Sequence, residues 1–578
     1  MAPTTAEATR TAAGRPARPR RAASRTALLA GVVLAVLVWL VLYPNLYVLA
    51  DSLRLSGRWT LAAYARFLRS PSELGALWNS VWISLASVVL SGLVGVPLAF
   101  LFTRFDFPGR RLLAALAALP VLLPPLVGVI AFLFLYGETG FLTRGVQLLL
   151  GLEAPPWRLN GPAAILLVHA YTMYVYFYMF TSAALARLDP AQAEAARALG
   201  ASGLTVLRRV TLPLLFPAIG GAALLVFMTS MGSFSAPYVF GGGFRVLTTQ
   251  VFVSKLNGTP EDLALAAVEA VVLAATSLLF LGLLERLERG RAYTGAGKGI
   301  APVRRRGAAD TGAGILALLV VIVLILPHLT VGLVSLVPLG TWTTELFPPE
   351  LSLVNYRLMF GDAARLRPIL NSLNMATTST IANVALAIAA AWLIVRRPFR
   401  GKGLVGALVA LPWALPGTVL ALALATTFSV NAPWAGRFVL VGTAAILPLA
   451  YFIRNIPLVT RAALTSFRQL DPAVEEAAAS LGAGPARTLG RVVVPLVLPG
   501  LLAGALLAFV TALGEFVASI LLYTHSTRPI SVEILSQLRA YDFGAAAAYA
   551  VLLIVVMAIV FGVGQMAAAD DAVRRGGG

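Results

Sequence analysis

Residues 188–200 of this chain read LDPAQAEAARALG, and residues 470–482 read LDPAVEEAAASLG. Both segments run from an Asp-Pro pair through Glu-Ala-Ala to a glycine, and a proline follows each glycine thirteen residues later. The aspartate of each copy is suited to cap a helix that begins at the proline. The glycine stands where that helix would end in a left-handed turn. The sequence therefore predicts two equivalent helix–turn–helix elements, which we call the docking elements.

The sequence around the docking elements is that of a membrane protein. Hydrophobic residues make up 59% of the 578 residues and charged residues only 12%, with a mean hydropathy of +0.85. So few charges could not solvate a soluble protein of this length. The uncharged run 26–50 is long enough to cross about 30 Å of hydrocarbon as a helix. The ten-residue alternating segments of an outer-membrane barrel are missing. We expect an all-α polytopic membrane protein.

About twelve transmembrane helices are predicted, as two parallel repeats of six. Basic residues gather in the segments that would share one side with the N-terminus, such as 10–25, 104–111 and 396–402. This bias is typical of cytoplasmic segments, so we expect both termini in the cytoplasm. The expected spans lie near 27–50, 78–103, 113–136, 162–186, 213–238, 262–284, 311–338, 370–395, 403–427, 438–459, 496–522 and 543–567.

The net charge of +20 does not indicate a nucleic-acid partner. The basic residues are not interleaved with aromatic ones and do not gather in a soluble domain. The basic N-terminal arm is instead expected to lie against anionic lipid headgroups. The apolar run that follows the arm is too long for a signal peptide, so it reads as an uncleaved first helix. The chain has no cysteine, which excludes disulfides and thiolate metal sites.

The repeat extends well beyond the docking elements. Asn79-Ser80 corresponds to Asn371-Ser372, and Gly232-Ser-Phe corresponds to Gly514-Glu-Phe. Parallel repeats keep the same orientation, so both docking elements are expected on the cytoplasmic side. The predicted organisation is a basic arm at 1–25, a first repeat at 26–285, a linker at 286–310, a second repeat at 311–567 and a tail at 568–578.

Each docking element has the residue pattern of a partner-binding loop. Its alanine-rich side is small enough to enter a groove, and identical spacing in two copies argues against an ordinary amphipathic loop. The pattern, Glu-Ala-Ala, a glycine and then an aliphatic residue before a proline, resembles that of type I ATP-binding-cassette (ABC) importer permeases. The second copy departs from it only in having Val494 before its proline. The residues that the resemblance assigns to ATPase coupling are Asp189, Glu194, Ala195, Ala196, Gly200, Pro213, Asp471, Glu476, Ala477, Ala478, Gly482 and Pro495.

The resemblance implies a fused permease of a bacterial inner membrane that takes up a solute from an extracytoplasmic binding protein. Two separate ATPase subunits would bind the docking elements and supply ATP and Mg²⁺. The chain itself is expected to be no enzyme and to bind no cofactor or metal. The segment around Lys298 looks like a phosphate loop, but Lys298 is followed by Gly299 and no Gly-x4-Gly-Lys-Ser/Thr pattern is met.

Substrate identity depends on weaker signals. Glu515, Ser233 and Glu269 are polar residues in or beside expected spans and are candidates to line the pathway. The segment from Glu515 to Tyr523, with Thr527-Arg-Pro-Ile-Ser531, resembles ferric-iron permeases, and hard oxygen ligands suit Fe³⁺. Thiamine and phosphonate importers are the alternatives. A twelve-span secondary transporter is a different class that the paired docking elements disfavour. A membrane enzyme is disfavoured because no acid–base or metal constellation is present.

Overall fold

The computed structural model describes residues 20–288, 307–342, 345–430 and 435–576. Most of the predicted arm at 1–25 and of the predicted linker at 286–310 lies outside the described residues. Apart from turns and loops, the described part is helical except for one antiparallel pair of two-residue strands, β1 (Arg54–Leu55) and β2 (Arg58–Trp59). The predicted fold class, an all-α polytopic membrane protein, is confirmed.

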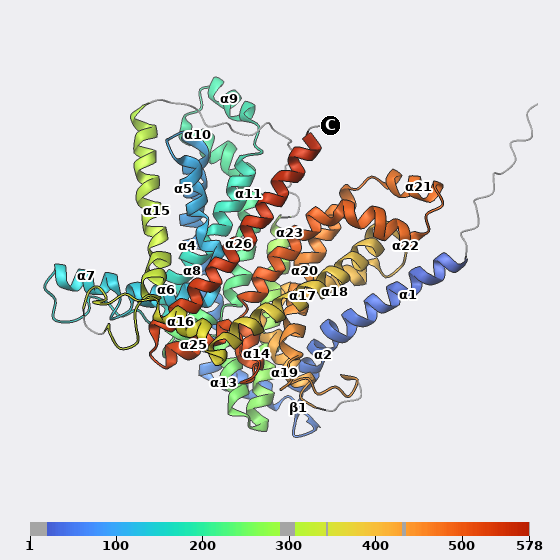
Figure 1. The fold of residues 1–578 in the computed structure, drawn as a ribbon, viewed down its shortest axis with the longest axis horizontal. Helices are drawn as coiled ribbons and strands as arrows, with labels where there is room; N and C mark the ends of the chain where they lie inside the picture. Colours follow the sequence, from blue (N-terminus) through green and yellow to red (C-terminus); the bar gives the residue numbers. More distant parts are fainter. Residues whose placement is uncertain (1–19, 289–306, 343–344, 431–434, 577–578) are drawn as a thin grey trace, which may run out of the picture.

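The first repeat contains fourteen α-helices and three short helical segments of other types among the described residues (Figure 1). In chain order they are α1 (Arg20–Leu37), the π-helix η1 (Val38–Leu42), α2 (Tyr43–Ser52), α3 (Ala62–Arg69), α4 (Pro71–Arg104), α5 (Arg110–Ala117), the 3-10 helix η2 (Leu119–Leu122), α6 (Pro125–Tyr136), α7 (Phe141–Leu149), α8 (Gly161–Leu185), α9 (Pro190–Ala198), α10 (Gly203–Val206), the π-helix η3 (Leu207–Thr211), α11 (Leu212–Met231), α12 (Ser235–Phe240), α13 (Leu247–Asn257) and α14 (Pro260–Glu288).

From α17 onward the second repeat follows the order of the first from α4 onward, except that α18 takes the place of α5 and η2 and that α7 has no α-helical counterpart among the described residues. Its elements are α15 (Ala308–Val334), α16 (Val354–Gly361), α17 (Ala363–Arg396), α18 (Lys402–Ala414), α19 (Gly417–Thr427), α20 (Ile446–Gln469), α21 (Pro472–Ser480), α22 (Pro485–Thr488), the π-helix η5 (Leu489–Val493), α23 (Val494–Leu513), α24 (Val517–Leu522), α25 (Ile530–Arg539) and α26 (Phe543–Gly576).

Ten helices of the described residues are long and apolar enough to cross a membrane, or eleven if the bent pair α18–α19 counts as one span. The span predicted at 438–459 fails this test. Its helix, α20, begins later and carries Arg454, Arg461 and Arg468. Nevertheless α20 packs along α17 as α8 packs along α4, so it fills the same place in its repeat. The count of spans is lower than predicted because α20 carries these charges, and the topology of the second repeat is unchanged.

The third predicted span of each repeat is not a continuous helix. The segment predicted at 113–136 is divided among α5, η2 and α6, and the segment at 403–427 bends by 107° between α18 and α19. Each break ends at a proline, Pro124 or Pro416, which forms the N-cap of the following helix. Proline lacks the N–H that a continuing helix needs, and it restricts the residue before it.

The fifth predicted spans also end earlier than expected. α11 and α23 stop at Met231 and Leu513, and the separate short helices α12 and α24 follow Gly-Ser-Phe and Gly-Glu-Phe turns. At their other ends, α11 and α23 run back without a break through a π-helical turn to Gly203 and Pro485. The second helix of each docking element is thus the start of a membrane-spanning helix, which begins about ten residues before the spans expected at 213–238 and 496–522.

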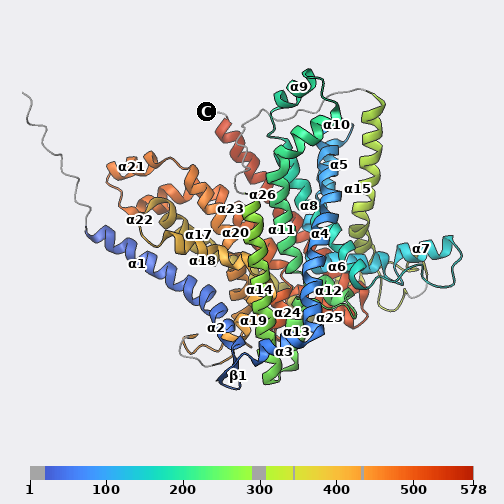
Figure 2. The same ribbon diagram turned by 180° about the vertical axis from the view of Figure 1, so that it is seen from behind.

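The first long helix of each repeat packs against the other repeat. α1 and α2 lie against α17, α18 and α19, and α15 lies against α5 and α6 (Figures 1 and 2). The Trp39 ring meets the Phe428 ring edge-on, with centroids 5.8 Å apart. In the other crossing, the Tyr171 hydroxyl donates to the Leu324 carbonyl (2.6 Å). This exchange joins the two repeats into one core.

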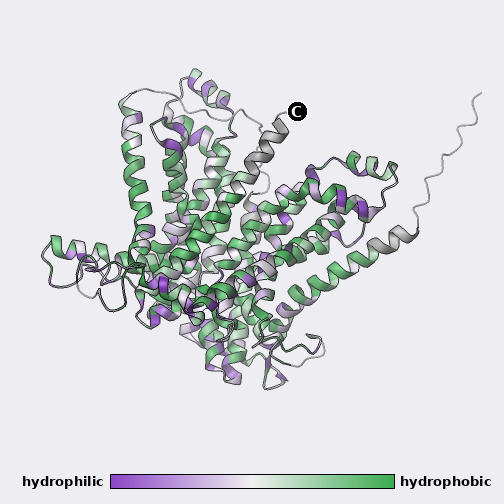
Figure 3. Ribbon diagram, viewed as in Figure 1, coloured by the Kyte–Doolittle hydropathy of each residue, from purple (hydrophilic) through white to green (hydrophobic). Residues whose placement is uncertain are grey.

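The outer surface of the helices is apolar. Figure 3 shows hydrophobic residues along the long helices and hydrophilic ones gathered near α9, α10 and the loops at the opposite end. Large aliphatic side chains point outward along the spans, among them Leu93, Leu279, Leu319 and Ile559. Such a surface is stable in lipid and not in water.

Candidate functional site: docking helices and the seam between the repeats

The first docking helix, α9, is defined by its two ends. Its N-cap is Asp189, whose Oδ1 accepts the Ala191 N–H (3.0 Å), and Pro190 is the first helical residue. At its other end Gly200 has a φ of +84°. The Ala201 N–H donates to the Ala196 carbonyl (3.0 Å), and the Gly200 N–H to the Arg197 carbonyl (2.9 Å). This is the left-handed stop that a glycine allows at low cost.

The second docking helix, α21, repeats this geometry. Asp471 Oδ1 accepts the Ala473 N–H (2.9 Å), and Gly482 has a φ of +80°. The Ala483 N–H donates to the Ala478 carbonyl (3.0 Å), as the equivalent residue does in α9. Figures 1 and 2 show α9 and α21 at the same end of the molecule, on diverging arms formed by the two repeats. Equal sequence spacing has produced equal local structure.

Both docking helices present an exposed surface. Glu194 and Glu476 are exposed in α9 and α21, and so are the alanines that follow them, Ala195 and Ala477; Ala196 is half-buried and Ala478 is buried. The proline of each docking element, Pro213 or Pro495, lies in the first turn of α11 or α23.

Sequence reasoning missed the leucine before each glycine. Leu199 and Leu481 are each 89% exposed, more than any other large hydrophobic residue of the described chain. Such exposure of a leucine at two equivalent turns is unusual, because burial of the side chain would be favourable by about 1.5–3 kcal/mol. The available signal was the Leu-Gly pair that ends both copies.

The two docking helices differ in how they are held. Arg396, at the end of α17, pairs with Glu475 of α21 (Nε to Oε1, 2.7 Å) and also donates to the Leu470 carbonyl (2.6 Å). The equivalent Arg104 at the end of α4 contacts Thr211 Oγ1 at 3.5 Å, and Ala193 stands where α21 has Glu475. An ion pair therefore ties α21 to its repeat at a point where α9 has none.

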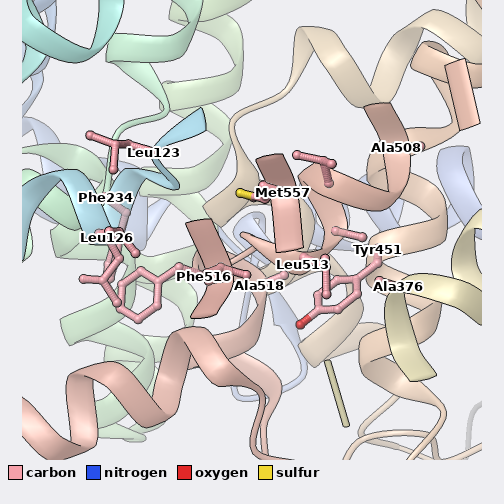
Figure 4. Close-up of a cluster of buried hydrophobic side chains, with 14 of the residues drawn as sticks. Leu123, Leu126, Phe234, Ala376, Tyr451, Ala508, Leu513, Phe516, Ala518 and Met557 are labelled. Atoms are coloured by element: carbon pink, nitrogen blue, oxygen red, sulfur yellow. The ribbon is translucent and has the colours of Figure 1, made fainter. Parts of the chain in front are cut away.

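The two repeats meet at the turns that follow α11 and α23. The Phe234 and Phe516 rings, at equivalent positions, lie 5.9 Å apart. Figure 4 shows Phe234 beside Leu126 on one side, with Phe516, Leu513 and Ala518 on the other. We call this contact, together with Gly232, Gly514, Pro124 and Pro416, the seam.

The seam is closed by a reciprocal contact. A Cβ built at Gly514 would lie 3.2 Å from Pro124 Cβ, and one built at Gly232 would lie 3.6 Å from Pro416 Cα. Each repeat thus sets its glycine turn against the proline break of the other repeat. The predicted third spans break at the prolines and the predicted fifth spans end at the glycines. Both kinds of break therefore lie at the same interface between the repeats.

Glu515 lies at the seam and is only 8% exposed. Its Oε2 lies 3.3 Å from Arg454 Nε, and its Oε1 accepts the Ala518 N–H (3.0 Å) at the start of α24. Both carboxylate oxygens thus have partners within the chain. The carboxylate balances the charge of Arg454, which explains how an arginine is accommodated in α20.

Ser233, the counterpart of Glu515, has a different partner. Its Oγ lies 2.8 Å from Nε2 of the buried His169, whose Nδ1 lies 2.9 Å from Ser87 Oγ and 3.2 Å from Ser230 Oγ. The residues that correspond to His169 and Thr172 in the second repeat are Tyr451 and Arg454. The seam is therefore flanked by a histidine–serine network in one repeat and by an ion pair in the other.

Glu269, the third candidate pathway residue, is not at the seam. It is fully buried in α14, where its Oε1 accepts the Ser254 hydroxyl (2.9 Å). A cleft of about 400 Å³ lies nearby, lined in part by Glu73, Tyr238, Arg245, Gln250 and Ser254. Within the described ranges, three or more His, Cys, Asp or Glu residues nowhere form a group able to hold a metal ion.

Comparison with known proteins gives matches along nearly the whole chain. Residues 91–293 and 383–570 match the family described as "Binding-protein-dependent transport system inner membrane component". The chain is 31% identical to the "Probable ABC transporter permease protein y4fN" of Sinorhizobium fredii, over 91% of this chain and 93% of that protein.

Two further relatives differ in what their names say they carry. The "Ferric transport system permease protein FbpB" of Actinobacillus pleuropneumoniae is 26% identical over 91% of this chain and 76% of its own length. The "Sulfate transport system permease protein CysT" of Escherichia coli is 32% identical, over 39% of this chain and 84% of its own length.

Proposed function

We propose a role in ferric-iron uptake for this chain, which belongs to the binding-protein-dependent transport system inner membrane component family and is the permease of an ABC transporter. The family domain occurs twice, so the fused two-repeat organisation is confirmed. Membership also removes the secondary-transporter alternative. The substrate, the partners and the orientation in the membrane are proposals that follow from this premise.

The docking helices α9 and α21 are the proposed contacts with two ATPase subunits. In support, both expose the same residues in the same local geometry, and Leu199 and Leu481 offer an apolar anchor to each subunit. Burial of each leucine in a groove of its partner would be favourable by about 1.5–3 kcal/mol. The chain would contribute no ATP-hydrolysing residue.

We place the docking helices on the cytoplasmic side. Arg104 and Arg396 end α4 and α17 near them, and more basic residues follow in the loops at 110–111 and 397–402. Short cytoplasmic loops are enriched in such residues. The opposite end, with α13, α25 and the two strands, would then receive the solute from an extracytoplasmic binding protein.

The proposed barrier to permeation is the seam. Since α10, η3 and α11 form one uninterrupted helix from Gly203 to Met231, a displacement of α9 would be carried to the turn at Gly232. The same holds for Pro485 to Leu513 in the second repeat. Packed interfaces of this kind change between discrete arrangements and do not deform gradually. ATP-driven movement of the docking helices would thus separate the glycine turns from the opposing prolines.

The substrate assignment rests on one observation, the similarity to a ferric permease along 91% of this chain. The sulfate permease matches only about one repeat, and thiamine and phosphonate remain the other substrates to test. Glu515 is weaker support for an iron substrate than its sequence position suggests, because Arg454 already balances the charge of its carboxylate.

Uptake by the reconstituted importer tests the assignment. Proteoliposomes would contain this chain with the ATPase and binding protein of its own organism, and ATP would be supplied on the ATPase side. We expect ATP-dependent uptake of ⁵⁵Fe³⁺ and none of sulfate, thiamine or a phosphonate. Uptake of one of these three solutes, with none of iron, would contradict the proposal.

A further inference from the structure

Two buried carboxyl groups face each other beside the cleft in the first repeat. Glu73, in the first turn of α4, is 7% exposed and Glu269 of α14 is fully buried. Gln250 and Ser254, one turn apart on α13, donate to Glu73 and Glu269 respectively, which places the two carboxyl groups side by side. Neither Oε2 atom has a hydrogen-bond partner among the described residues. Two adjacent buried carboxylates repel each other unless a positively charged group lies between or beside them.

Glu73 does not play the local role that its sequence position predicts. Ser70-Pro-Ser-Glu73 has the spacing of a capping box, in which the glutamate would accept the N–H of Ser70. Instead that N–H donates to the carbonyls of Arg66 and Phe67, and Glu73 Oε1 accepts from Gln250 Nε2 (3.1 Å). The carboxylate is thus turned away from the helix end and toward α13 and α14.

The nearby arginines have other partners. Arg66, which lines the cleft, forms an ion pair with Asp262 (2.9 Å), and Arg245 donates to Ser72 Oγ (2.6 Å). Neither is paired with Glu73 or Glu269 among the described contacts. The carboxyl pair therefore receives its direct hydrogen bonds from neutral groups only, those of Gln250 and Ser254.

The second repeat lacks this arrangement. Arg365 stands at the position of Glu73, counted from the Asn-Ser pair that both repeats share. Leu552 stands at the position of Glu269, counted from Gly258 and Tyr541, whose φ angles are both positive. An apolar residue at this position shows that helix packing does not require an acid there.

The cleft connects this pair to the seam. Tyr238 lines the cleft and stacks on Phe234, with ring centroids 5.1 Å apart, and Phe234 meets Phe516 at the seam. The end of the molecule that carries the cleft is also the end away from the docking helices (Figure 1).

We propose that Glu73 and Glu269, with Gln250 and Ser254, form a binding site for a hard metal cation in the first repeat. Carboxylate, amide and hydroxyl oxygens are the ligands that hard cations prefer. Two carboxylates supply the charge, and the cleft supplies access from one end of the molecule. A role of this site in iron transport rests on the proposed function. Its ability to bind a cation does not.

Terbium luminescence tests cation binding directly. Tb³⁺ is a hard trivalent ion, and excitation of a neighbouring aromatic ring such as Tyr238 sensitises its emission. The full-length chain in lipid nanodiscs would be titrated with TbCl₃ in phosphate-free buffer. We expect saturable emission from the parent and at least a tenfold weaker affinity in Glu269→Gln and in Glu73→Gln.

Glu261→Gln is the matched control, since Glu261 is an exposed acid on the same helix, α14. It should bind Tb³⁺ as the parent does. Thermal unfolding without metal shows which variants are folded. If Glu269→Gln does not fold, the affinity of Glu73→Gln for Tb³⁺ decides the test. Equal affinity in the parent and the folded variants, or no saturable emission from the parent, would overturn the proposal and leave a shared proton as the occupant of the pair. Tb³⁺ binding without iron uptake would contradict only the proposed substrate.

Discussion

Phe234 and Phe516 occupy equivalent positions in two repeats of one chain, and their rings meet across the interface with centroids 5.9 Å apart. Around them each repeat sets a glycine turn against a proline break of the other. The contact is symmetric in backbone but not in chemistry, because Ser233 and Glu515 follow the two glycines. A duplicated chain can in this way keep one closing geometry while its halves diverge in what they present to a solute.

The fit at Gly514 is tighter than that at Gly232. A Cβ at Gly514 would lie 3.1 Å from Met557 Cε and 3.2 Å from Pro124 Cβ, whereas the contacts of Gly232 with Pro416 begin at 3.6 Å. We expect Gly514→Val to lower the free energy of unfolding by about 1–3 kcal/mol through overpacking. Gly232→Val, the matched change, should lower it less, because the first contacts of its Cβ with Pro416 lie at ordinary van der Waals distance. Denaturant unfolding in detergent measures the free energy of unfolding of both variants. Equal losses would contradict the tighter fit at Gly514.

The exposed leucines of the docking helices should matter for coupling and not for folding. Leu199→Asp and Leu481→Asp place a charge where an apolar side chain is 89% exposed. Surface changes of this kind alter stability by about 0.5 kcal/mol or less. If these leucines anchor the ATPase subunits, each variant should weaken subunit binding about tenfold or more, because the apolar contact is lost and a charge would be buried in its place. Co-purification and uptake assays measure this, and normal assembly of the double variant would refute the anchor.

Substitution of the docking glycines, Gly200 and Gly482, should act only through the backbone conformation. A Cβ at Gly200 or Gly482 would meet no atom within 4 Å, but both residues have φ near +80°. Valine is strained in that region, so Gly200→Val and Gly482→Val should each cost about 1 kcal/mol or more in the local turn. We expect lower uptake with normal membrane insertion. Gly203→Ala, at an open position with ordinary φ, is the control, and full uptake by the double valine variant would contradict the prediction.

Local features of this fold could be predicted from the sequence, and long-range ones could not. The caps at Asp189 and Asp471 and the turns at Gly200 and Gly482 depend on neighbouring residues, and both were predicted correctly. The prolines were visible as well, but they were placed within continuous helices. Whether a proline kinks or breaks a span depends on what packs against it, in this case the glycine turn of the other repeat.

The candidate pathway residues divide in the same way. Burial of Glu515 and Glu269 could be anticipated from their apolar neighbours, whereas their partners come from other helices. Arg454 is 61 positions from Glu515 along the chain, and Glu73 is 196 positions from Glu269. Single-sequence reasoning has no access to such pairs, because periodicity reports the face of a helix and not the neighbour it meets.

The ion pair between Arg454 and Glu515 gives the most informative test, because the first repeat supplies its neutral equivalent. Arg454→Thr and Glu515→Ser introduce the residues found at Thr172 and Ser233. Each single variant leaves one charge of a largely buried pair without its partner, so the free energy of unfolding should fall by about 1–3 kcal/mol. The double variant removes both charges, and its stability should recover most of that loss.

Uptake then separates a structural role from a role in the pathway. If the pair only accommodates Arg454 in α20, the double variant should recover uptake together with stability. We expect otherwise, because Glu515 lies at the seam, which we propose as the barrier that opens for each solute. Uptake of ⁵⁵Fe³⁺ by the double variant should therefore stay well below that of the parent while ATPase assembly remains normal. Full recovery of uptake would show that the pair is structural and that the pathway does not depend on its charges.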